Sequence, residues 1–69
     1  RIALNVIFYP DASESALRNF LEKYKGQIIG GPGAAGVYTL SFPKPDNPET
    51  FIKSLKDQKN LILFAEIKN

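Results

Sequence analysis

Apolar and polar residues follow strand-like and helix-like patterns in turn along this 69-residue chain. Residues 2–9 (IALNVIFY) are rich in β-branched and aromatic side chains, which predicts a strand ending at Pro10. In residues 11–24, apolar side chains recur at i, i+3, i+4 and i+7, the spacing of one helix face. They are Leu17, Phe20, Leu21 and Tyr24.

The residues around this helix match known end signals. Asp11 or Ser13 can cap its start by accepting a hydrogen bond from a free backbone N–H. Gly26 lies where a left-handed residue commonly ends a helix, so we expect it to take that conformation.

The second half of the chain repeats the pattern. Residues 27–30 (QIIG) and 37–42 (VYTLSF) predict two strands, joined by the glycine-rich turn 30–36. After the loop 43–48, Asn47 caps a helix whose first residue is Pro48. The buried stripe of that helix is Phe51, Ile52 and Leu55, and residues 61–67 (LILFAEI) predict the last strand.

The predicted order is β-α-β-β-α-β, which defines an α+β, ferredoxin-like fold spanning residues 1–69 as one domain. Right-handed crossovers place both helices on one face of a four-stranded antiparallel sheet. The first and third strands are then central, and the second and fourth lie at the edges. The other face of the sheet is left for solvent or a partner.

Strand alternation predicts which side chains occupy that uncovered face. The core side chains are Leu4, Val6 and Phe8 on the first strand, and Tyr38, Leu40 and Phe42 on the third. With Glu66 facing outward, Ile62 and Phe64 face outward too, whereas a one-residue slip would bury Phe64. The predicted partner-binding residues are Asn5, Ile7, Tyr9, Val37, Thr39, Ile62, Phe64 and Glu66. Apolar patches of this kind usually mark interaction sites.

The composition argues against enzyme chemistry. The chain has no His, Cys, Met or Trp, so thiol chemistry, nucleophilic triads and the usual zinc sites lack their side chains. We expect no catalytic residues, no cofactor and no metal. The net charge of +2 comes from scattered basic residues, whereas a nucleic-acid binder shows a basic stripe. No apolar run approaches the roughly 20 residues that span a bilayer. Because the chain begins without Met, we expect it to be a fragment of a longer protein.

Related folds with known ligands fit the sequence poorly. The GGPGAAG turn has no Lys and precedes a strand, unlike a phosphate-binding loop. RNA-recognition domains stack bases on outward aromatics, but Tyr38 and Phe42 are assigned to the core. An ACT-like small-molecule sensor would bind ligand at the turn after the first strand, which here contains no glycine. It stays open as a further alternative.

Several loose motifs occur in a recognisable order. Val6, Phe8 and Pro10 form a hydrophobic-x-Phe-x-Pro unit, and a helix with a Leu-x-x-Phe-Leu stripe follows. A Gly-Val-Tyr strand comes next, and the last strand closes on Ala65 and Glu66. This order resembles the propeptide domains of subtilisin-like proteases, of the peptidase-inhibitor type. Similar segments also occur in extracytoplasmic parts of proteobacterial membrane-bound regulators, including anti-sigma-factor-like proteins.

The resemblance implies a regulatory role through a protein partner. In such propeptides, the open sheet face packs on two helices of the protease and acidic residues near the last strand cap them. Glu66 would have that capping role, and residues 67–69 would begin the inhibitory tail. Ile67 stands where Pro often follows the Ala-Glu pair, so a regulator's extracytoplasmic (periplasmic or secreted) interaction domain is favoured over a protease propeptide. The sequence does not determine the oligomeric state.

Overall fold

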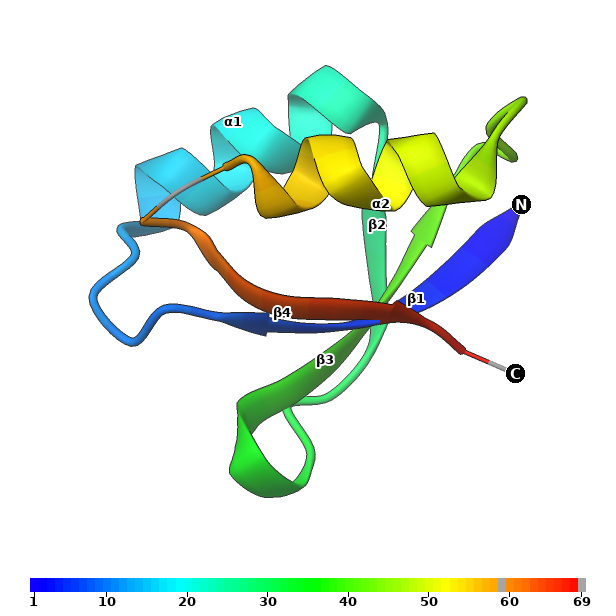
Figure 1. Ribbon diagram of the computed structural model, residues 1–69. Coiled ribbons are helices and arrows are strands. Elements are labelled where there is room, and N and C mark those ends of the chain that lie inside the picture. Colours follow the sequence, from blue (N-terminus) through cyan, green and yellow to red (C-terminus); the bar gives the residue numbers. More distant parts are fainter. Residues whose placement is uncertain (59, 69) are drawn as a thin grey trace.

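The computed structural model describes residues 1–58 and 60–68, and the order of its elements is the predicted one (Figure 1). The elements are β1 (Ile2–Phe8), α1 (Glu14–Tyr24), β2 (Gln27–Gly30), the short 3-10 helix η1 (Ala34–Gly36), β3 (Val37–Phe42), α2 (Pro48–Lys56) and β4 (Ile62–Ile67). Asn69, the end of the expected tail, lies outside the described residues.

The four strands form one sheet in the order β2-β3-β1-β4, with every neighbouring pair antiparallel. The central strands are β1 and β3, and the edges are β2 and β4, which confirms the predicted α+β, ferredoxin-like arrangement. Both helices cover the same face of this sheet (Figure 1). The opposite side, called the open face below, is bordered at one end by the loop that joins β2 to β3.

The core lies between the helices and the sheet. Leu4, Val6, Leu40, Phe42 and Leu55 are fully buried. Phe8 and Tyr38 point to the same side and pack against this core. Apolar side chains that alternate along a strand and recur every three or four positions along a helix meet in one layer, so the sequence pattern placed these residues correctly.

Both helices begin at side-chain caps. The Ser13 hydroxyl accepts a hydrogen bond from the Ala16 N–H at 3.1 Å, so Ser13 rather than Asp11 caps α1. In α2, Asn47 Oδ1 accepts from the Thr50 N–H at 3.1 Å, and Pro48 occupies the first turn, as predicted.

The prediction for the end of α1 is wrong by one residue. The left-handed residue is Lys25, with φ 57°, and not Gly26. Gly26 is needed for space instead, because a Cβ atom there would lie 2.5 Å from Cε1 of the buried Phe42 ring.

The last strand also differs from the prediction at one position. Ile62, which was expected on the open face, is 4% exposed and belongs to the core. The register of β4 against β1 shifts between Ile7 and Phe8, so Phe64 lies opposite Ile7 while Ile62 lies opposite Phe8. The extra residue of this β-bulge is Leu63. A bulge breaks the alternation of side chains, so the residues before and after it no longer follow one pattern of faces. Phe64 and Glu66 therefore face outward as predicted, but Ile62 faces inward.

Candidate protein-binding surface

The open face is built from two rows of side chains that cross the three strands β3, β1 and β4. Val37, Ile7 and Phe64 lie side by side in one row, and Thr39, Asn5 and Glu66 lie in the next. Residues directly opposite each other on antiparallel strands have neighbouring side chains, so each row is a continuous strip. One strip is apolar and the other is polar.

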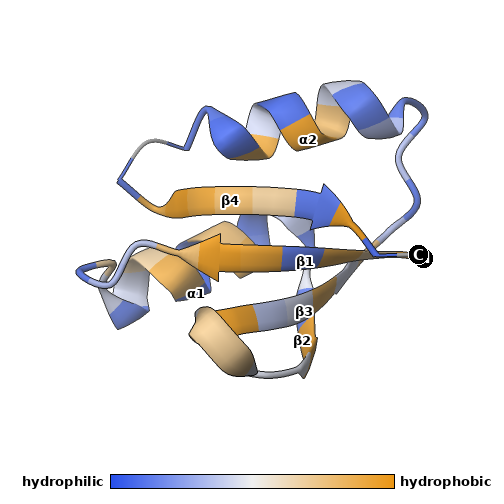
Figure 2. Cartoon of the chain, turned by 60° about the horizontal axis from the view of Figure 1, so that its bottom comes forward, coloured by the Kyte–Doolittle hydropathy of each residue, from blue (hydrophilic) through white to orange (hydrophobic). Residues whose placement is uncertain are grey.

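Figure 2 looks onto this face and shows the polar row as adjoining hydrophilic segments on β1 and β4. The Thr39 hydroxyl lies 3.5 Å from Asn5 Oδ1, which links β3 to β1 within the row. Glu66, at the end of the row, is exposed. Within residues 1–58 and 60–68 it forms no ion pair, since the pair there joins Arg18 to Glu14 on α1. The carboxylate is therefore available to a partner.

Exposure of the apolar row increases toward β4. Phe64 is 41% exposed and Leu63, the bulge residue beside it, is 53% exposed. Ile7 and Val37 are half-buried by their neighbours. Leu63 was not among the predicted site residues. The unbroken apolar run 61–64 was the signal that simple alternation would fail there.

Arg1 closes the other end of the open face. Its Nε donates to Ser41 Oγ at 2.7 Å, and Nη2 donates to the Ser41 carbonyl at 2.9 Å and the Lys25 carbonyl at 3.2 Å. Ser41 is only 8% exposed. Sequence patterns gave no sign of this contact, because it joins residues 40 positions apart.

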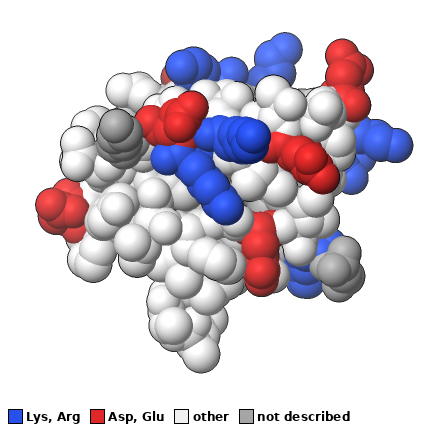
Figure 3. Space-filling view, in the orientation of Figure 1, with Lys and Arg blue, Asp and Glu red and all other residues white. Residues whose placement is uncertain are grey.

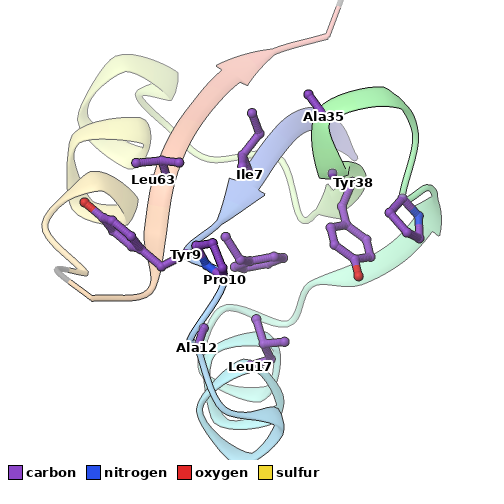
Figure 4. Close-up of a pocket in the computed structure, with 11 residues that line it drawn as sticks. Ile7, Tyr9, Pro10, Ala12, Leu17, Ala35, Tyr38 and Leu63 are labelled. Carbon is purple, nitrogen blue, oxygen red and sulfur yellow. The ribbon is translucent and has the colours of Figure 1, made fainter.

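A pocket of about 460 Å³ opens where β1 ends, between the start of α1 and the β2–β3 loop (Figure 4). All of its lining residues are uncharged, and Ile7 and Leu63 belong both to it and to the open face. Tyr9, a predicted partner-binding residue that follows β1 and is 37% exposed, lines it too. The pocket thus extends the apolar row.

Charge is distributed unevenly over the molecule. In Figure 3 the charged side chains gather over the helices, and the β2–β3 loop at the bottom carries none. The sequence agrees, because residues 26–43 include no Asp, Glu, Lys or Arg. β2, β3 and the loop between them therefore carry no charge, whereas Glu66 places an acidic side chain on the open face.

Comparison with protein-family models, with curated proteins and with solved structures finds no match for this chain. Among the described residues, no three His, Cys, Asp or Glu side chains are grouped so that they could hold a metal ion. Neither α1 nor α2 is long and apolar enough to cross a membrane.

Proposed function

We propose that this domain is a non-catalytic, regulatory protein-binding module that recognises a protein partner with the open face of its sheet. The observation that carries the proposal is the pair of adjoining rows, one apolar and ending at Phe64, the other polar and ending at Glu66. Apolar side chains supply most of the favourable free energy of association, while a defined charge sets orientation.

The chemistry of the face indicates the kind of partner. The partner surface is apolar where it meets Ile7, Val37 and Phe64. It presents a positive group or a helix N-terminus to Glu66, because free N–H groups and the helix dipole favour a carboxylate there. By resemblance, the partner is a component of an extracytoplasmic regulatory system.

A capture experiment with three versions of the immobilised domain tests this proposal. An extract of the source cells is passed over the wild type, Phe64→Asp and Ile28→Asp. Ile28 is 50% exposed, and it pairs with buried Leu40, so its side chain lies on the helix side of β2. Ile28→Asp therefore controls for the effect of a charge that is added away from the open face. We expect a protein that the wild type and Ile28→Asp retain and Phe64→Asp loses. Equal retention of the same proteins by all three would overturn the proposal.

The alternative is a propeptide-type inhibitor of a subtilisin-like protease. The exposed Glu66 carboxylate on the open face supports it, since that is where the resemblance places a helix-capping acid. The test is inhibition of peptide hydrolysis by a subtilisin-like protease, with Glu66→Gln beside Glu49→Gln. Glu49 is an exposed acid on α2, in the helical layer. Inhibition weakened only by Glu66→Gln supports the alternative, and no inhibition at high concentration rejects it.

A further inference from the structure

The β2 edge is a second exposed surface, separate from the open face. β2 ends the strand order, so one side of its backbone has no strand beside it in the described part of the chain. Ile28 and Ile29 on this strand are 50% and 58% exposed. An edge strand with free backbone N–H and C=O groups is a template for pairing with another strand.

A β-bulge accounts for two successive exposed isoleucines. Ile28 lies opposite Leu40, and the ladder then skips Ile29 to pair Gly30 with Thr39. Ile28 therefore has its side chain on the helix side, while Ile29 is the unpaired extra residue. The bulge shortens the stretch of β2 that can form backbone hydrogen bonds with another strand. Apolar contact of these two side chains therefore has to supply much of the free energy of any association.

Both edge strands contain a β-bulge, which opposes pairing with another chain, but the two edges differ in charge and in cover by a helix. The β4 edge carries Glu66 and is followed by Lys68, and α2 lies beside the strand (Figure 2). Charged side chains on an edge oppose pairing with another chain. The β2 edge has no charge from residue 26 through residue 43. Pairing with another uncharged strand therefore brings no like charges together at this edge.

We propose that two copies of this chain associate through their β2 edges, antiparallel about a two-fold axis. A two-fold interface places the same patch of both copies face to face, so the patch must be compatible with itself. With the axis between Ile28 and Ile29, each Ile28 faces Ile29 of the other copy. Lys25, the nearest charge before β2, then faces the region of Pro32 in the uncharged loop. The open face stays free for a different partner.

The test is the mass of the purified domain by light scattering over a concentration series. We expect the wild type to rise from one toward two chain masses. Ile29→Lys places like charges near the axis and should weaken association about tenfold or more. Leu63→Lys is the matched control, because Leu63 is a bulge residue of similar exposure, 53%, on the other edge. It should associate like the wild type.

A mixing experiment separates loss of association from loss of folding. Ile29→Lys and Ile29→Glu are each expected to be monomeric, and their equimolar mixture is expected to associate because opposite charges then meet across the axis. A wild type that keeps one chain mass at every concentration would overturn the proposal. So would a mixture no more associated than its components, or equal weakening by Leu63→Lys. The readout requires no partner for the open face, so this result is independent of the proposed function.

Discussion

Gly26 lies between the end of α1 and the start of β2, directly against a buried aromatic ring. A Cβ atom at this position would lie 2.5 Å from Phe42 Cε1, 3.0 Å from Phe42 Cδ1 and 3.1 Å from Leu21 Cδ2. Phe42 is fully buried, so its ring has little room to move away. The glycine is therefore required by close approach of the backbone to the core.

We expect Gly26→Ala to lower the free energy of unfolding by about 1–3 kcal/mol, the usual cost of forcing an extra methyl group into a packed core. The control is Gly33→Ala, because the nearest atom to a Cβ there is the Val37 carbonyl oxygen at 3.7 Å. Gly33 also has an ordinary φ of −91°. Urea unfolding of both variants checks the prediction. A Gly26→Ala variant as stable as the wild type would show that Phe42 can shift.

At the scale of elements, the bulge in β4 decides which side chains a partner can reach. It places Ile62 in the core and Leu63 and Phe64 at the surface, although all three side chains are large and apolar. A β-bulge also occurs in β2, at Ile29. Both edge strands thus present an apolar bulge residue.

The sequence pattern was sufficient for most elements and insufficient for the bulge. β2 and β3 have their predicted bounds, and both helices begin at predicted cap residues, since periodicity and capping residues are local signals. In the run 61–64 every residue is apolar, so the sequence shows no alternation that would tell which side chains face the core. The outward position of Glu66 predicted the face of Phe64 correctly. The register shift that precedes Phe64 in the strand, however, depends on pairing with β1. A contact between distant strands cannot be predicted from a local pattern.

Paired aspartate substitutions test the bulge directly. Ile62→Asp would bury an unpaired carboxylate and should cost more than about 3 kcal/mol, enough to unfold much of a domain this small. Phe64→Asp should change stability by no more than about 1 kcal/mol, because its side chain is already 41% exposed. Circular dichroism and thermal melting measure both. The reverse order of stabilities would place Phe64 in the core and remove it from the open face.

At the scale of the whole molecule, a ring of four aromatic side chains joins the helices to the sheet. Phe20 and Tyr24 of α1, Phe51 of α2 and Phe42 of β3 contact one another in sequence, with centroid distances of 5.2 to 6.1 Å. Three of these four pairs are edge to face, an arrangement that stabilises beyond the area it buries. The ring holds both helices on one face and so leaves the open face and the β2 edge exposed.

If this ring binds the layers together, its members should be energetically coupled across them. We expect a double-mutant cycle of Phe42→Leu and Phe51→Leu to give a coupling of about 0.5–1.5 kcal/mol, because these rings meet edge to face at 5.2 Å. The control cycle pairs Phe42→Leu with Phe64→Leu. Phe64 lies on the opposite side of the sheet, so the two changes should add within about 0.5 kcal/mol. Urea unfolding of the single and double variants supplies both values. Equal coupling in the two cycles would mean that Phe42 transmits strain through the sheet itself, and the open face would then respond to changes in the core.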